Sequence, residues 1–341
     1  MRVGVFKGVR RIEVEDAPDP VAGPRDVVID VKACGICGSD LHSYLEGALV
    51  RPGQVLGHEF AGEVVDVGAD VSGIAVGDRI TALPLQPCGE CRRCREGIEH
   101  LCERMHERGI GFGYPGAFAE RLLIPGAELG VNVHRLPDEL SFDEGALVEP
   151  LGVAVHSVRR AGAAAGQSAL VYGLGPIGLH VAQALCARGV GPVLGVDLSP
   201  LRRERAEELG VVALDGAGDV EAAVAAALDG GELDLVFECT GAAPLLQRSL
   251  ELVRTHGTVA VVALYDRHAT VDPNVLVHKE ATLVGSAMVT PEDFREALEL
   301  LRDGRAVAGP LVTHRERLAD LPAAFELQCD KDATIKVLVA P

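Results

Sequence analysis

A glycine-rich turn between a predicted strand and a predicted helix is the feature that most restricts the fold of this chain. The strand is predicted at Ser168–Tyr172, and the helix follows the turn and runs to about Arg188. In a G-x-G-x-x-G turn the first glycine permits a tight bend, the second lets the backbone approach a pyrophosphate, and the third lets the helix pack closely on the strand. The free N–H groups and the positive dipole end of the helix would face the phosphates. The turn therefore predicts a dinucleotide site at Gly173, Leu174, Gly175, Pro176, Ile177 and Gly178.

Strands alternate with helices throughout the region that follows, and this order predicts a doubly wound parallel sheet. The next strand is expected at Pro192–Val196, and a helix begins near Pro200, with Ser199 as its N-cap, and ends at Gly210. The later predicted strands are Leu233–Glu238, Thr258–Val262 and Thr282–Gly285, and the later predicted helices are Ala243–Val253 and Pro291–Leu301.

The first third of the chain is predicted to be rich in β-strands. Short segments with Val and Ile, at Val27–Val31, Gly62–Val67 and Arg79–Thr81, are separated by Gly, Pro and Asp. The tail Ala333–Val339 has the same character, so we expect it to return to the first domain.

Asp197 directly follows the strand after the glycine turn. A carboxylate there accepts hydrogen bonds from the ribose hydroxyls of an adenosine and repels a 2′-phosphate, so the sequence favours NAD over NADP. Arg202 and Arg203 weaken this preference, because an arginine can receive the phosphate.

Four cysteines within fifteen residues predict a metal site: Cys88, Cys91, Cys94 and Cys102. Four sulfur ligands suit a closed, structural zinc site that leaves no coordination position for a substrate. A disulfide framework is not expected, because the chain is long and its N-terminal region has no apolar signal segment. The lobe carries glutamates as well as arginines, which indicates a solvated mixed-charge surface rather than a nucleic-acid ribbon.

A second metal site is predicted from Cys37 and His58, which stand apart from the lobe. A catalytic zinc needs about three protein ligands and one open position. The third ligand is expected to be a carboxylate, either Glu59 or Glu149.

Charge and hydropathy exclude several classes of partner. The 341 residues carry a formal net charge of −18, which argues against nucleic acid or an anionic membrane as a partner. Residues 161–187 lack charged side chains, but their glycines and proline favour a buried strand, turn and helix over a membrane span. We therefore expect a cytoplasmic protein with reduced thiols, no membrane segment and no nucleic-acid partner.

Five motifs give the chain a resemblance to the zinc-dependent medium-chain alcohol dehydrogenases over essentially its whole length. They are CGICGSDLH, GHEFAGEVVDVG, the four-cysteine lobe, VEPLGVAVH and GLGPIG, in that order. The Glu-Pro pair resembles the polyol, butanediol and threonine dehydrogenases. The lobe is more similar to the butanediol and threonine members, because sorbitol-type members often lack it. The resemblance implies an α/β protein with a GroES-like, β-rich catalytic domain at residues 1–155 and 290–341, including the lobe at 86–104, and a Rossmann domain at 156–289.

The resemblance also implies roles for single residues. Cys37 and His58 would bind the catalytic zinc, and Glu149 or Glu59 would complete the ligand set or exchange within it. Asp40 would fix the ring of the zinc-bound histidine.

A proton relay and a set of cofactor contacts follow from the same resemblance. Ser39 would begin the relay and His42 would end it. Contacts to the cofactor are implied for Ile177, Asp197, Arg202, Val262, Ala263, Leu264, Ser286 and Ala287.

The implied activity is the reversible oxidation of a secondary alcohol, a small polyol or a vicinal diol, to a ketone, with two zinc ions per chain and NAD. Zinc would lower the pKa of the substrate hydroxyl, and hydride would pass to the nicotinamide. The alternatives are an L-threonine 3-dehydrogenase and a zinc-containing redox-sensing regulatory protein. Relatives are homodimers or homotetramers, so a homo-oligomer is expected.

Overall fold

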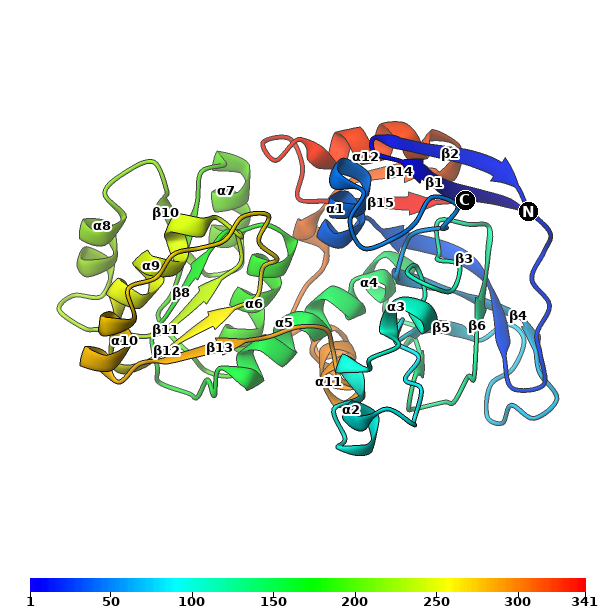
Figure 1. The fold of residues 1–341 in the computed structure, drawn as a ribbon, viewed down its shortest axis with the longest axis horizontal. Helices are drawn as coiled ribbons and strands as arrows, with labels where there is room; N and C mark the ends of the chain where they lie inside the picture. The colour runs from blue at the N-terminus through cyan, green and yellow to red at the C-terminus, as the bar shows by residue number, and fades with distance from the viewer. The chain divides into compact units, whose positions relative to one another are not determined.

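The computed structural model describes residues 1–341, which divide into two compact units. Unit 1 consists of Met1–Gly152 and Val289–Pro341, and unit 2 is the continuous segment Val153–Met288. Unit 1 therefore holds both the blue and the red ends of the colour scale in Figure 1, whereas unit 2 runs from green to orange.

Unit 1 is built on a seven-stranded sheet in the order β14-β15-β3-β4-β5-β7, with β6 paired to β3. A separate hairpin of β1 and β2 adds two antiparallel strands. The strands are β1 (Arg2–Gly8), β2 (Arg11–Asp16), β3 (Val27–Gly35), β4 (Glu59–Val67), β5 (Arg79–Ala82), β6 (Arg121–Ile124), β7 (Val133–Arg135), β14 (Val312–Arg317) and β15 (Lys336–Ala340).

Strand β3 lies at the centre of this sheet. Strand β4 pairs with one edge of β3 over its whole length, while β6 pairs with the first half of the other edge and β15 with the second half. The apolar residues of β3 are buried on both faces, which is typical of a central strand. The register sets Val339 opposite Cys34 and Leu338 opposite Gly35. The predicted return of the tail is thus confirmed.

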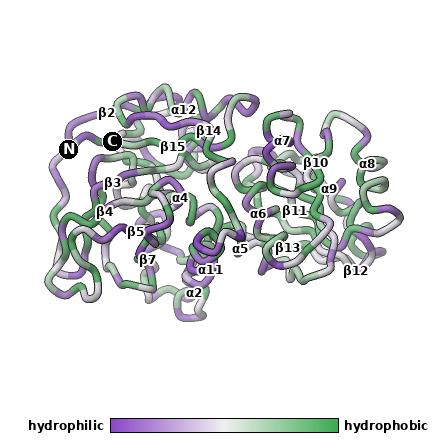
Figure 2. Tube along the Cα trace, turned by 180° about the vertical axis from the view of Figure 1, so that it is seen from behind, coloured by the Kyte–Doolittle hydropathy of each residue, from purple (hydrophilic) through white to green (hydrophobic).

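Short helices connect the strands of unit 1. They are α1 (Gly38–Glu46), α2 (Arg92–Arg95), η1 (Glu99–Leu101), α3 (Met105–Arg108), α4 (Phe142–Ala146), α11 (Pro291–Arg302), η2 (Gly309–Leu311), η3 (Leu318–Asp320) and α12 (Leu321–Cys329); α5 (Val148–Arg160) begins in unit 1 and ends in unit 2. Hydrophilic and hydrophobic residues alternate along α11 (Figure 2), and Phe294 and Leu301 are among its buried residues. The side chain of Thr290 accepts a hydrogen bond from the N–H of Asp293 and so caps the N-terminus of α11.

Unit 2 is a doubly wound sheet of six parallel strands in the order β10-β9-β8-β11-β12-β13. The strand order reverses between β8 and β11, and this switch point is where open sheets of this kind bind ligands. Its elements are β8 (Ala169–Tyr172), α6 (Pro176–Ala187), β9 (Val193–Asp197), α7 (Pro200–Glu208), β10 (Val212–Asp215), α8 (Val220–Ala227), β11 (Leu233–Glu238), α9 (Ala243–Leu252), β12 (Val253–Val261), α10 (Pro273–Lys279) and β13 (Thr282–Gly285).

Several details of unit 2 differ from the sequence-based expectation, and helices α8 and α10 were not predicted. Ser199 occupies the N-cap position of α7, but its side chain makes no capping hydrogen bond. Strand β12 begins at Val253, because Val253 already pairs with Leu233 of β11. Strand β10 was not predicted; it is a four-residue edge strand whose side chains are exposed or half-exposed.

Candidate active site and metal centres

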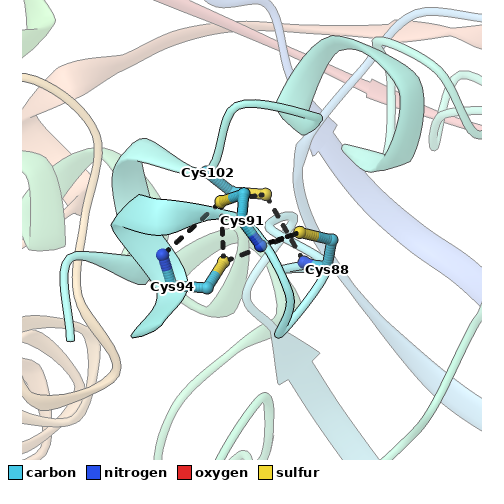
Figure 3. Close-up of side chains that lie close together, drawn as sticks. All are labelled: Cys88, Cys91, Cys94 and Cys102. Atoms are coloured by element: carbon cyan, nitrogen blue, oxygen red, sulfur yellow. Dashed lines mark hydrogen bonds between the residues drawn. The ribbon is translucent and has the colours of Figure 1, made fainter. Parts of the chain in front are cut away.

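The four cysteines of the lobe bring their sulfur atoms together. Cys91 is the N-cap residue of the short helix α2, Cys94 lies within this helix, and Cys102 follows the turn η1 (Figure 3). The Sγ atoms are 3.4 Å apart for Cys91 and Cys94, 3.9 Å for Cys88 and Cys94, and 4.0 Å for Cys91 and Cys102. Four sulfurs at about 2.3 Å from a zinc ion would stand about 3.8 Å from one another in a tetrahedron. The cluster therefore fits a structural zinc ion.

Backbone N–H groups point at these sulfurs, which favours thiolates. The N–H of Cys91 lies 3.3 Å from Sγ of Cys88, and the N–H groups of Cys88 and Arg104 each lie 3.4 Å from Sγ of Cys102. Hydrogen bonds from the backbone of Glu103 and of Cys94 lower the pKa of Cys91 to about 6. None of the nine cysteines forms a disulfide.

Replacing Cys91 by serine is expected to remove one zinc ion per chain and to lower the melting temperature, because a structural zinc site contributes directly to folding. Zinc analysis and thermal unfolding would measure both effects. Cys186→Ser is the matched control, since Cys186 is an exposed cysteine of α6. Unchanged zinc content in Cys91→Ser would contradict the assignment of the lobe.

A second group of donors lies in unit 1 where β3 and β4 meet. Cys37 is the N-cap residue of α1, His58 directly precedes β4, and Glu59 is the first residue of β4. One ligand atom from each of these three side chains lies within 4.8 Å of the other two. His58 and Glu59 are buried, with 5% and 0% of their surface exposed. The structure thus brings together three of the four predicted catalytic zinc ligands within one cluster.

Asp40 and Ser39, both in α1, flank the ring of His58. Nδ1 of His58 lies 3.6 Å from Oδ1 of Asp40, and Nε2 lies 3.4 Å from Oγ of Ser39. Oδ2 of Asp40 accepts a hydrogen bond from the N–H of Cys37, which orients the carboxylate. Burial lowers the pKa of His58, but Asp40 and Cys37 raise it by more, so that the net pKa lies well above its usual value. These surroundings stabilise a positive charge beside His58 and therefore suit a cation.

The two carboxylate candidates have different surroundings. Both oxygens of Glu59 accept hydrogen bonds from Nζ of Lys336, at 2.6 and 2.9 Å, and this ion pair is almost fully buried. Nζ of Lys336 also donates to the carbonyl oxygen of Ile36. A Cβ added to Gly35 would lie 2.1 Å from Oε2 of Glu59, so only glycine leaves room for this carboxylate.

Glu149, near the start of α5, is buried in unit 1. Burial raises its pKa to about 7, although the proximity of His58 opposes this shift. His58 and Lys336 favour the ionised form of Glu149, but burial outweighs them, so a bound cation would help to keep this carboxylate ionised. Lys336 was not predicted as a site residue, because its only signal in the sequence is that it is one lysine within the apolar tail strand.

His42 is placed one helical turn after Ser39 in α1 and is partly exposed. Its Nδ1 lies 3.5 Å from Oε1 of Glu46, four residues later on the same helix. Positions three apart share a helix face, so Ser39 and His42 face the same side of α1.

The predicted cofactor residues of unit 2 gather at the carboxyl edge of its sheet. The glycine turn joins β8 to α6, Asp197 ends β9, Arg202 lies in α7, and the remaining positions directly follow β12 and β13. The latter are Val262, Ala263, Leu264, Ser286 and Ala287.

The glycine turn has the close approaches that a dinucleotide site needs. Gly173 has a φ of 87°, in the region that favours glycine. A Cβ added to Gly178 would lie 1.7 Å from the carbonyl oxygen of Gly173, so helix and turn could not pack with a larger residue. At the same edge of the sheet, the hydroxyl of Ser286 is buried without a hydrogen-bond partner. The residues present therefore fit a nicotinamide dinucleotide.

Asp197 is held by the backbone of this edge. Oδ2 accepts a hydrogen bond from the N–H of Leu174 at 2.7 Å, and Oδ1 accepts one from the N–H of Ser199 at 2.8 Å. Nη1 of Arg202 lies 3.9 Å from Oδ2 of Asp197. The carboxylate is thus fixed beside the glycine turn, with an arginine close to it.

None of the helices combines the length and the apolar character that a membrane span requires.

Two protein families match the sequence. Residues 23–138 match the family described as the alcohol dehydrogenase GroES-like domain, and residues 176–303 match the family described as zinc-binding dehydrogenase.

Individual relatives match over almost the whole chain. The (R,R)-butanediol dehydrogenase of Bacillus subtilis (strain 168) is 36% identical over 357 residues, which cover 100% of both chains. A crystal structure of 2R,3R-butanediol dehydrogenase from Bacillus subtilis has a TM-score of 0.90 and covers 100% of this chain and 99% of that chain, at 35% identity. The sorbitol dehydrogenase of Halalkalibacterium halodurans is 33% identical over 98% of this chain and 97% of its own. A protein from Sinorhizobium meliloti 1021, described as a zinc-binding dehydrogenase and bound to NADP, has a TM-score of 0.92 at 33% identity and covers 100% of this chain and 99% of that chain.

Proposed function

The chain belongs to the zinc-dependent medium-chain alcohol dehydrogenases, and we propose that it oxidises a small polyol or vicinal diol reversibly to a ketone with NAD. The observation that carries this proposal is the cluster of half-buried Cys37 with buried His58 and Glu59, beside the hydroxyl of Ser39. The names of the butanediol and sorbitol dehydrogenases support a diol or polyol substrate. They do not favour the L-threonine 3-dehydrogenase alternative, and the match to dehydrogenases over the whole chain favours an enzyme over a regulatory protein.

We assign the catalytic zinc to Cys37, His58 and Glu149. Glu59 lies close enough to exchange into the ligand set, but Lys336 holds both of its oxygens. A zinc ligand must offer a free lone pair in the ionised form. Binding by Glu59 would break its buried ion pair with Lys336, so Glu149 meets that need at a lower cost. The lobe cysteines are assigned to a second, structural zinc.

The residues of unit 1 supply proton transfer and orientation. When bound, zinc supplies a Lewis acid for the substrate hydroxyl and the nicotinamide accepts a hydride. Ser39 takes the hydroxyl proton, and His42 releases it to solvent from the same face of α1. The carboxylate of Asp40, 3.6 Å from Nδ1 of His58, favours a proton on that nitrogen and so leaves Nε2 as the ligand atom.

We assign residues 1–155 and 290–341 to the catalytic domain and 156–289 to the cofactor domain. The unpaired cysteines support a reducing compartment, the cytoplasm. A homodimer or homotetramer is proposed from the family, and light scattering coupled to gel filtration would test it.

The proposed function is tested by following NADH formation with butanediols, polyols and L-threonine, with NAD and with NADP. Turnover of a diol or polyol with NAD is expected. Exclusive turnover of L-threonine would replace the substrate assignment, and absence of turnover with every alcohol would overturn it.

Replacing Asp197 by serine is expected to raise the ratio of kcat/KM for NADP to that for NAD roughly tenfold, since it removes the charge that repels a 2′-phosphate. Steady-state kinetics with both cofactors would measure the ratio. Asp215→Ser is the control, because Asp215 ends the neighbouring strand β10 and is exposed. A wild-type enzyme that prefers NADP would contradict the role of Asp197.

Replacing His42 by alanine is expected to slow alcohol oxidation roughly tenfold, most strongly at low pH, where release of a proton to solvent is hardest. Small added bases should partly restore the rate. His278→Ala is the control, since His278 is an exposed histidine of α10 in unit 2. An unchanged pH–rate profile would remove His42 from the relay.

A further inference from the structure

A buried glutamate, Glu238, lies at the carboxyl end of β11, next to the switch point of the unit 2 sheet. Its carboxylate accepts hydrogen bonds from the N–H of Thr240 at 2.8 Å, the N–H of Gly241 at 3.2 Å and the hydroxyl of Thr240. The hydroxyl of Tyr265 donates a further hydrogen bond to Oε2 at 2.6 Å. A carboxylate with no exposed surface is thus stabilised by donors from two separate segments.

The second of these segments is the loop that follows β12. The N–H groups of Val262 and Ala263 donate to the carbonyl oxygen of Glu238, at 2.9 and 3.2 Å. Tyr265 then reaches the side chain of the same residue. Both the backbone and the side chain of Glu238 therefore hold this loop to the end of β11.

Close backbone approaches connect the same segments. Gly241 has a φ of 72°, and a Cβ added to it would lie 2.3 Å from the carbonyl oxygen of Leu264. A Cβ added to Gly173 would lie 2.7 Å from Cγ2 of Thr240. The glycine turn, the β11–α9 turn and the loop after β12 thus interlock at the edge where the cofactor residues gather.

The loop itself has little secondary structure to hold it. Residues 262–272 belong to no helix or strand, and Leu264 is 59% exposed. The side chain of Tyr265 is partly buried, and burial followed by its hydrogen bond to Glu238 raises its pKa above the usual value. Tyr265 therefore stays in its neutral form and donates its hydroxyl proton to the hydrogen bond with Glu238, because a phenolate would repel the carboxylate.

We propose that Tyr265, through its hydrogen bond to Glu238, is a positioning residue that keeps the loop at Val262–Leu264 ordered for the nicotinamide dinucleotide. This inference rests on the proposed function, because that function makes the loop a cofactor contact. Ordering this loop on binding would cost free energy. A protein whose loop is already ordered before binding avoids that cost and binds the dinucleotide more tightly. Tyr265 acts through the loop and has no part in the transfer of hydride or proton.

The test is Tyr265→Phe, which removes the hydroxyl and keeps the ring. The Kd for NADH, measured through the fluorescence of the bound dinucleotide, is expected to rise roughly fivefold to tenfold, from the usual strength of a hydrogen bond to a charged acceptor. KM for the dinucleotide should rise likewise, while KM for the alcohol stays unchanged. Amide hydrogen exchange at residues 262–265 should become faster in the protein without cofactor.

Tyr172→Phe is the matched control, because Tyr172 lies in the same sheet and its buried hydroxyl has no hydrogen-bond partner. It should leave the Kd for NADH and the exchange rates unchanged. Equal affinities and equal exchange rates for wild type and Tyr265→Phe would overturn the inference and leave the proposed function intact. A wild-type protein that binds neither NADH nor NADPH would overturn the proposed function and the inference with it.

Discussion

Replacing Cys37 by serine is expected to lower kcat by about 1000-fold or more while the chain stays folded. The thiolate is the soft ligand of the proposed catalytic zinc, and a Lewis acid that stabilises developing charge is worth several kcal/mol, with about 1.4 kcal/mol for each factor of ten. Zinc content should fall from about two ions per chain to about one, because the lobe keeps its own ion. Metal analysis, circular dichroism and steady-state kinetics would measure the three effects.

Cys329→Ser is the control for this experiment, since Cys329 lies in the same unit, outside both clusters, and is partly exposed. The variants Glu149→Ala and Glu59→Gln then distinguish which of the two carboxylates is the third zinc ligand. We expect Glu149→Ala to lose the catalytic zinc. Full activity and full zinc content in Glu149→Ala would transfer the role of third ligand to Glu59.

Replacing Lys336 by methionine is expected to lower the free energy of unfolding by about 3–5 kcal/mol, which is the usual cost of leaving one charge of a buried pair alone. The expected fall in melting temperature is roughly 10 °C. The cause is Glu59, whose carboxylate has no exposed surface and would lose the donor that holds both of its oxygens. Thermal and urea unfolding of the zinc-loaded protein would measure the loss.

Two further variants make this result specific. Lys331→Met removes an exposed lysine from the loop before β15 and should leave stability unchanged. The double variant Lys336→Met with Glu59→Gln should recover much of the loss, since the buried charge is gone. If the double variant is as unstable as Lys336→Met, the ion pair is not the cause.

The sequence predicted those parts of the molecule whose signals are local. The doubly wound sheet could be predicted because each strand, turn and helix of unit 2 occupies a short segment, and Asp197 stands at the end of its own strand. The zinc lobe could be predicted because its four cysteines lie within fifteen residues. The backbone donors to their sulfur atoms needed the structure.

Contacts between distant segments could not be predicted in the same way. Glu59 and Lys336 are 277 positions apart, and the register of β15 on β3 decides that they meet. The bond from Tyr265 to Glu238 likewise depends on how the loop after β12 folds back. No spacing rule in the sequence relates such residues, because the distance between them is set by sheet order rather than by chain length.

The composition of unit 1 from both ends of the chain has a consequence for synthesis on the ribosome. At about 5–20 residues per second, roughly 15 to 55 seconds pass between the emergence of Glu59 and that of Lys336, which are 277 positions apart. During this interval the nascent β3 and β4 lack both the neighbouring β15 and the counterion of Glu59. Unit 2 is continuous from Val153 to Met288 and can complete its sheet in the same interval. We therefore expect unit 2 to fold during translation. Unit 1 can complete its sheet only when its last strand, β15, has been released from the ribosome.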